Sequence, residues 1–411
     1  MPTPLTTLEK PIPEHVPIEL VKPYPLSAGQ WTYEDPFKTI IPKMHEGLPV
    51  IYSPNAWSGI ENAWVFRREE DIRAIFMDTE HFSSQGFSPF ANLVGESWGV
   101  LPVEADPPAH HGYRDILSPH LTPKKVAELE TQMRNYARSY IQKISAQGSC
   151  DVMEDFACRF PIKVFLQLFG LPLDEVEQFM QWEFALIHSA DMAEITAAVK
   201  AVKQRLMAEI NHRKHNPSDD LISHIAHSSH EGHPLNDDEI FGICFNLYLG
   251  GLDTVTTNIA WQLRHLASDI ELQNKLRSDP SLIPEAVEEM LRAYSAVAIS
   301  RTCVKTTEIG GVTLMPGDRV MLSTSLASND PAVFENPTEV KLGRKKRHLG
   351  FGTGIHNCVG VRLARRELLI ALEEFLLAIP TFKLAKNAKI VTHLSAVMYQ
   401  ESIPLVWSTA T

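Results

Sequence analysis

Residues 236–267, with the sequence NDDEIFGICFNLYLGGLDTVTTNIAWQLRHLA, carry the longest helical pattern in the chain. Asn236 and Glu239 have the spacing of a capping box, which predicts where the helix begins. A helix of about thirty residues is roughly 45 Å long at 1.5 Å per residue. The pattern therefore predicts one helix that crosses the whole molecule, with the other elements packed around it.

Two adjacent glycines, Gly250 and Gly251, lie in the middle of this helix, where each costs about 1 kcal/mol relative to alanine. They predict a groove in which a planar group or a small ligand approaches the helix backbone. The Thr254 hydroxyl can bond to the carbonyl of Gly250 and bend the helix, and Asp253 beside it supplies an acid for a proton path. Close packing of another helix at the glycines, with Asp253 in a salt bridge, explains the same residues.

The composition limits the class of protein. The 411 residues are 44% hydrophobic, which is enough to bury a large core, and no linker or repeat divides them. We expect a single domain over 1–411, in which the Pro-rich residues 1–30 form an extended arm and not an export signal. The longest apolar run, 240–252, is shorter than the ~20 residues that span a bilayer, so we expect no membrane segment. The net charge of −12 argues against nucleic acid as a partner.

The cysteines are odd in number and scattered, without a CxxC or CxxCH motif. They are Cys150, Cys158, Cys244, Cys303 and Cys358. This pattern disfavours a disulfide scaffold, a zinc ribbon and a covalently attached haem, and favours a reducing cytoplasm.

Helical periodicity dominates from about Thr122 onward. An amphipathic helix is predicted over 121–144, and further helices over 161–169, 173–188 and 192–213. Strand patterns are few and short, at 49–53, 63–67, 307–322 and 402–407. The fold is therefore predicted to be mainly α, with small peripheral β-sheets.

Glu289 and Arg292 stand three residues apart on one face of a short predicted helix, where they can form an ion pair. A surface pair worth about 0.3 to 0.5 kcal/mol is the ordinary explanation for such spacing.

The stretch FGTGIHNCVGVRLARREL, 351–368, surrounds Cys358 with glycines. Gly352, Gly354 and Gly360 permit positive φ angles and close approach of the backbone to a flat group. A thiolate just before the helical run is stabilised by the helix N-terminus, as an anionic metal ligand requires. The residues also allow a buried thiol or a nucleophile, although a nucleophile needs a nearby base and zinc needs further Cys or His ligands at suitable spacing.

The same stretch resembles the FGxGxHxCxGxxLAR signature of the cytochrome P450 haem-thiolate family. The matching positions are Phe351, Gly352, Gly354, His356, Cys358, Gly360, Leu363, Ala364 and Arg365. GGLDT at 250–254 is similar to the family's oxygen-activating segment, EMLR at 289–292 to its ExxR motif, and DPPAHHGYR at 106–114 to the DPPxHxxxR of bacterial members. The order and spacing fit over essentially the whole chain, and the pattern resembles most the camphor-hydroxylase branch.

The resemblance implies a cytochrome P450 fold and a role for each matching residue. Cys358 would be the axial ligand of haem b, flanked by Phe351 and Gly360, and would favour cleavage of dioxygen. Gly250 and Gly251 would also border the cofactor. The residues implied as partners of the haem propionates are His110, Arg114, Arg301 and His356. Asp253 and Thr254 would deliver protons during dioxygen activation, while Glu289 and Arg292 would be structural. Arg344 would be their third member, although Val340 replaces a phenylalanine of the family's FxxPxxFxxxR motif.

The resemblance also implies the partners and the substrate pocket. The pocket residues would be Phe87, Trp98, Val103, Asn246, Leu249, Val297, Ile299, Ala396 and Val397. Most are apolar, which suits a small hydrophobic substrate. Trp98 aligns with the tyrosine that binds the ketone in camphor hydroxylases, so we expect a terpenoid or norisoprenoid, such as an ionone, and not camphor.

No flavin or nicotinamide motif occurs in the chain, so electrons must come from outside. A basic group near Cys358 suits an acidic [2Fe-2S] ferredoxin, supplied by a ferredoxin reductase. It consists of Lys341, Arg344, Lys345, Lys346, Arg347, Arg362, Arg365 and Arg366. We expect a monooxygenase of the bacterial cytoplasm that uses O2. A non-catalytic haem-binding protein and a peroxide-driven peroxygenase are the alternatives.

Overall fold

The computed structural model describes residues 10–409 except Ser58, Ile60, Phe87, Ala190 and Lys346. Its helices are α1 Pro36–Glu46, α2 Glu69–Met77, α3 Phe90–Leu93, α4 Ala109–Leu117, α5 Pro123–Ser145, α6 Arg159–Phe169, α7 Val176–His188, α8 Met192–His215, α9 Leu221–Ala226, α10 Asp237–Gly251, α11 Asp253–Ser268, α12 Ile270–Ser278, α13 Ile283–Ala293, α14 Thr324–Ser328 and α15 Val361–Ala378. Short 3-10 or π turns occur at Ile18–Leu20, Ser118–Leu121, Met153–Ala157 and Pro280–Leu282. The prediction of a mainly helical fold is confirmed.

The strands are short and form several small sheets. They are β1 Gln30–Thr32, β2 Val50–Trp57, β3 Glu61–Phe66, β4 Phe82–Ser83, β5 Ser149–Asp151, β6 Ser229–His230, β7 His233–Pro234, β8 Ala298–Cys303, β9 Thr307–Ile309, β10 Val312–Leu314, β11 Arg319–Ser323, β12 Phe382–Leu384, β13 Thr392–Leu394, β14 Tyr399–Gln400 and β15 Pro404–Trp407. The largest sheet has the order β2-β3-β11-β8-β4, in which only the β3–β11 pair is parallel. Smaller sheets are β1-β13-β14, β12-β15-β5, β9-β10 and β6-β7.

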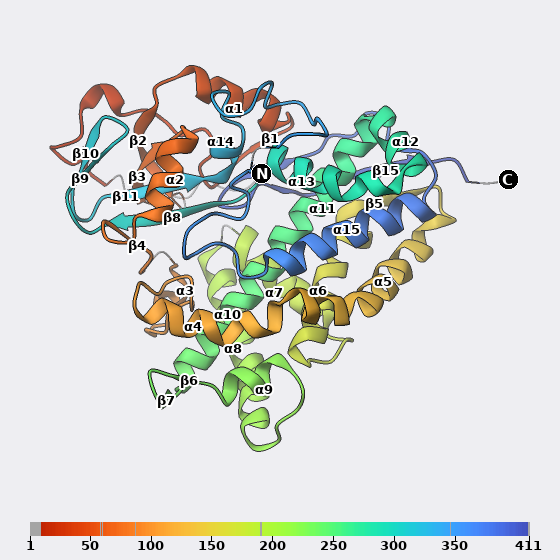
Figure 1. Cartoon of the computed structure of the whole chain (residues 1–411), viewed down its shortest axis with the longest axis horizontal. Coiled ribbons are helices and arrows are strands. Elements are labelled where there is room, and N and C mark those ends of the chain that lie inside the picture. The colour runs from red at the N-terminus through yellow and green to blue at the C-terminus, as the bar shows by residue number, and fades with distance from the viewer. Residues whose placement is uncertain are drawn as a thin grey trace.

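Three helices accompany the largest sheet, and most of the others lie on the opposite side of the molecule (Figure 1). Figure 1 shows the five-stranded sheet with α1, α2 and α14 on one side and α4 to α11 with α15 on the other. Two groups of buried apolar side chains form the core: one joins the large sheet to α5, α11, α13 and α15, and the other lies among α4 and α6 to α10. In the part of the chain that the structure describes, every helix is too short or too polar to traverse a bilayer.

The long helical pattern begins where the capping box predicts but does not form one helix. The Asn236 side chain accepts from the Glu239 N–H at 3.0 Å, and the Glu239 carboxylate accepts from the Asn236 N–H at 2.8 Å. The helix then ends at Gly251, and a second begins at Asp253, with Leu252 at φ −103° and ψ −73° between them. The prediction of one uninterrupted helix was wrong at this residue, because two consecutive glycines weaken the helix where Thr254 diverts the carbonyl of Gly250.

The other predicted helices lie within a few residues of α5, α6, α7 and α8. The predicted strand region 307–322 divides into β9, β10 and all of β11 except its last residue, Ser323. The sequence pattern missed β8, which lies between β11 and β4 in the large sheet. Of the predicted arm, residues 10–29 contain only the Ile18–Leu20 turn and one bridge from Val21 to Tyr52, and residues 1–9 lie outside the described residues.

Candidate functional site

A cavity lies where the two apolar cores meet. Its walls come from α6, from the α10–α11 junction, from the start of α15 and from the glycine-rich loop that precedes α15. Cys358, Thr254 and His110 all line it, although they are far apart in the sequence. The structure therefore brings the predicted cysteine loop and the predicted glycine pair to one site.

The loop around Cys358 takes its shape from two of its glycines. Gly352 and Gly354 have φ of 65° and 73°, and a Cβ on Gly354 would stand 2.8 Å from the carbonyl oxygen of Phe76. Gly360 has φ −81° and precedes α15 as its N-cap, so it does not use the positive φ that glycine permits. A Cβ there would lie 3.9 Å from Cys358 Sγ. The loop thus leaves the sulfur accessible from the cavity.

The surroundings of Cys358 have opposing effects on the pKa of its thiol. Burial raises the pKa of the thiol, while the N–H of Gly360 and the charges of Arg114 and Arg365 lower it. The chain positions the sulfur by a hydrogen bond from the Cys358 N–H to the Phe351 carbonyl, at 2.9 Å. Since cations and a helix-terminal N–H oppose the effect of burial, the sulfur suits an anionic ligand role.

Four basic side chains converge beside the loop, as predicted. His110 and His356 have ring centroids 4.3 Å apart, and burial together with the neighbouring arginines lowers the pKa of His110 to about 4 and of His356 to about 3. Burial also lowers the pKa of Arg301 to about 10 and that of Arg114. Both ring nitrogens of His110 and Nη2 of Arg301 are buried without a hydrogen-bond partner in the described structure. Such a group of donors is complementary to a buried anion.

The opposite wall contains the glycine pair and Thr254. A Cβ added at Gly250 or Gly251 would meet no atom within 4 Å, which confirms open space beside the helix. The Thr254 hydroxyl donates to the Gly250 carbonyl at 2.9 Å, as predicted. Asp253 does not line the cavity: it is 1% exposed, and its Oδ1 lies 3.0 Å from His188 Nε2. The predicted acid and alcohol are therefore adjacent in sequence but point to different surroundings.

The structure separates the predicted pocket residues into two groups. Val103, Asn246, Val297 and Ile299 line the cavity. Four others lie outside its lining: Trp98, Leu249, Ala396 and Val397. Phe87 lies outside the described residues.

Trp98 is directed away from the cavity by its packing. Its ring packs edge-on against Phe241 and Phe245 of α10, at centroid distances of 4.7 and 5.0 Å, and its Nε1 donates to Glu96 at 2.5 Å. Lys203 of α8 lies over the same ring, 5.8 Å from its centroid. With its one donor already bonded, Trp98 is not available to a substrate ketone. Val397 forms an isolated backbone bridge with Val297, and the Ala396 carbonyl accepts from the Ala298 N–H at 2.7 Å.

Sequence reasoning missed several polar groups at the site. Asn258 and Glu367 line the cavity, and burial raises the pKa of Glu367 well above its usual range. The Ser84 hydroxyl lies 3.0 Å from Nε2 of His356. Asn258 could have been found because it follows Thr254 by four residues on one helix face. Ser84 carries no comparable sequence signal.

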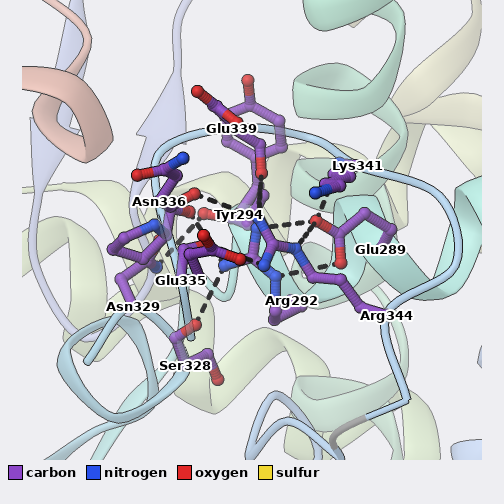
Figure 2. A network of polar contacts seen from close by, with 12 residues as sticks. Glu289, Arg292, Tyr294, Ser328, Asn329, Glu335, Asn336, Glu339, Lys341 and Arg344 are labelled. Atoms are coloured by element: carbon purple, nitrogen blue, oxygen red, sulfur yellow. Dashed lines mark hydrogen bonds and ion pairs between the residues drawn. The ribbon is translucent and has the colours of Figure 1, made fainter. Parts of the chain in front are cut away.

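Glu289 and Arg292 form the predicted ion pair, which is buried and belongs to a larger network of polar contacts (Figure 2). Arg292 and Arg344 both donate to Glu289 Oε1, at 2.8 Å each, and Arg292 Nε donates to Oε2 at 3.0 Å. Arg292 also donates to the backbone carbonyls of Ser328, Pro337 and Glu339. Arg344 is thus the third member despite Val340, and the network fixes the segment that leads into the cysteine loop.

Comparison with known proteins agrees with this geometry. The cytochrome P450 family model matches residues 171–379. The chain is 36% identical over 404 residues to the probable cytochrome P450 127A1 of Sinorhizobium fredii, covering 97% of each protein. The chain belongs to the cytochrome P450 family. The crystal structures of cytochrome P450 CYP101C1 and of CYP101J2 both match with a TM-score of 0.87, at 32% and 28% identity, covering 97% of this chain and 100% of each of theirs. These relatives confirm the predicted fold and the camphor-hydroxylase-like branch.

The cofactor of this cytochrome P450 is haem b, and the residues of the cavity fit it. The unpaired nitrogens of His110 and Arg301 suit the two propionates, and the open space beside Gly250 and Gly251 suits a flat macrocycle. Cys358 offers the sulfur that would hold the iron. The protein is accordingly a monooxygenase.

Proposed function

We propose that this monooxygenase hydroxylates a small hydrophobic terpenoid or norisoprenoid, such as an ionone, with electrons from a [2Fe-2S] ferredoxin. The observation that carries the substrate class is the wall of the cavity. Val103, Leu247, Val297 and Ile299 are apolar, and Asn246 adds an amide beside them. A compact apolar molecule with one acceptor oxygen suits such a wall, because burial supplies the affinity and the amide can fix the orientation.

The proposed electron donor rests on the basic side chains around the cysteine loop. Lys341, Lys345, Arg347 and Arg362 are exposed, and in the described structure they form no ion pair. Three others predicted for this patch are engaged elsewhere: Arg344 with Glu289, Arg365 with Glu288 and Arg366 with Glu130. Lys346 lies outside the described residues. Exposed cations on a chain of net charge −12 support docking of an acidic redox protein there.

In the proposed mechanism the haem supplies the chemistry of dioxygen activation, and the chain supplies position and protons. Cys358 would hold the cofactor and supply electron density to it. The Thr254 hydroxyl, which donates to the Gly250 carbonyl, keeps its lone pairs free to accept a hydrogen bond from the cavity side. Asp253 carries protons to this region, for which its carboxylate must exchange its contact with His188. The break at Leu252, the residue before Asp253, gives the backbone there the freedom that this exchange needs.

The substrate and donor are tested by spectroscopy and reconstitution. We expect β-ionone to shift the ferric haem from low to high spin at micromolar concentration, and camphor to do so more weakly. We also expect a hydroxylated product with a [2Fe-2S] ferredoxin and its reductase. A long-chain fatty acid that gives the larger shift would contradict the substrate class. Turnover with peroxide but not with ferredoxin would favour the peroxygenase alternative.

Replacement of Thr254 by alanine should uncouple electron consumption from product. The variant loses the hydroxyl that accepts from the cavity side, so we expect electron consumption to continue while product per electron pair falls several-fold and peroxide appears. Thr254→Ser keeps the hydroxyl and should retain most of the coupling. Equal coupling in the alanine variant and the parent would rule out a role of the hydroxyl in proton delivery.

A further inference from the structure

A second group of metal-ligand side chains lies behind the cavity wall. Glu183 and His188 near the end of α7 and Asp253 at the start of α11 each direct one ligand atom to a common point, and these atoms lie within 4.8 Å of one another. His188 Nε2 and Asp253 Oδ1 are 3.0 Å apart. The His188 and Asp253 side chains are only 5% and 2% exposed. The Tyr399 ring covers the imidazole at a centroid distance of 4.0 Å.

The ion pair between His188 and Asp253 leaves this group incompletely satisfied. Asp253 Oδ2 and Glu183 Oε1 are both buried without a hydrogen-bond partner in the described structure. Burial, and then the charge of Asp253, raise the pKa of Glu183 well above its usual range. The other titratable groups that sense these carboxylates are Cys158, Tyr248 and Tyr399, none of which is a cation.

In the described residues no lysine or arginine forms an ion pair with Glu183 or Asp253. Asp253 thus pairs with the His188 imidazole, and the nearby Glu183 carboxylate adds a second acid without a lysine or arginine partner in the described residues. A buried charge of this kind is stabilised by a proton or by a metal ion.

We propose that Glu183, His188 and Asp253 form a binding site for Zn²⁺. One imidazole nitrogen and two carboxylate oxygens are ligands that zinc accepts, whereas Ca²⁺ and Mg²⁺ prefer oxygen alone. Adjacent ligand atoms of a tetrahedral zinc site stand about 3.3 Å apart when each is about 2.0 Å from the metal. The separation of 3.0 Å between His188 Nε2 and Asp253 Oδ1 is close to that value, and a side-chain adjustment of Glu183 completes the set.

Zinc at this site would affect catalysis through Asp253. This effect rests on the proton-delivery role proposed for Asp253 above. With its carboxylate bound to the metal, Asp253 is held on the α7 side of α11 and is removed from the route to Thr254. Zinc is therefore expected to slow proton delivery without displacing substrate or haem.

The test is calorimetric titration of the untagged, substrate-free holoenzyme with ZnCl2. We expect one site per chain that Glu183→Gln and His188→Gln each weaken by more than about tenfold, since even outer-shell partners of a metal are worth 10–100-fold in affinity. His393→Gln is the matched control, because His393 forms a pair with Glu401 at 2.5 Å on the surface and should leave the tight site unchanged. The carbon monoxide spectrum of each variant shows whether the haem site is intact.

Equal zinc affinity in the parent, Glu183→Gln and His188→Gln proteins would overturn the proposal. In a second measurement, one equivalent of zinc should reduce product per electron pair in the parent but not in His188→Gln. Tight binding that both variants lose, with unchanged coupling, would establish the metal site and contradict the proton-delivery role of Asp253. The two proposals therefore fail through different measurements.

Discussion

Replacement of Cys358 by serine will abolish the strongly red-shifted Soret band of the reduced carbon monoxide complex and, with it, substrate hydroxylation. The sulfur is the only thiol among the described residues that lines the cavity, and Gly360 leaves it accessible there. A serine oxygen holds its proton far more strongly than a thiol and donates less electron density to iron. Turnover should fall below about one-thousandth of the parent rate, equivalent to roughly 4 kcal/mol in the activation barrier.

Cys303→Ser is the matched control for this experiment. Cys303 is fully buried in β8, and its thiol donates to the Lys305 carbonyl at 3.0 Å, a bond that serine can also make. The control should keep the red-shifted band and the parent turnover. A Cys358→Ser protein that keeps the band would show that another residue binds the iron.

Local patterns predicted the parts of the site that depend on nearby residues. The capping box at Asn236, the bond from Thr254 to Gly250 and the positive φ of Gly352 and Gly354 each involve residues within four positions of each other. Such features follow from the stereochemistry of glycine and from side chains that bond to their own backbone. The resemblance to cytochromes P450 then located the cofactor, because its motif covers the same short stretches.

Contacts between distant segments explain the features that the sequence did not predict. His188 and Asp253 are 65 residues apart, and no pattern in either segment names the other as a partner. Trp98 lies outside the cavity lining, where Phe241, Phe245 and Lys203 contact its ring and Glu96 accepts from its nitrogen. An alignment places a side chain at a position, but packing decides which way it points.

Replacement of Glu289 by alanine will destabilise the fold more than removal of an ordinary surface ion pair. Arg292 is 1% exposed, and the substitution leaves it and the neighbouring Arg344 without their shared carboxylate. Breaking a buried pair by removing one partner costs about 3–5 kcal/mol, because an uncompensated charge remains buried. The denaturant midpoint of unfolding and the retention of haem should both fall.

The adjacent residue provides the control. Glu288 also lies in α13 and pairs with Arg365 of α15, and these two side chains are 43% and 42% exposed. Its carboxylate also lies 3.5 Å from Nε2 of His348. Glu288→Ala should cost clearly less than Glu289→Ala, since water solvates the arginine that remains. Equal destabilisation by the two substitutions would show that burial does not determine how much the network contributes to stability.

Haem retention in the Glu289→Ala protein tests a second role of the network, in positioning the cysteine loop. Arg292 and Arg344 bind the backbone carbonyls of Glu335, Asn336, Pro337 and Glu339, and this segment leads through residue 347 into the loop that carries Cys358. If the network positions the cysteine loop, Glu289→Ala should lose haem at denaturant concentrations where the helical signal is still that of the parent. Simultaneous loss of haem and helix would assign the network to global stability alone. The order of the two transitions therefore separates a role in building the haem site from a role in the fold as a whole.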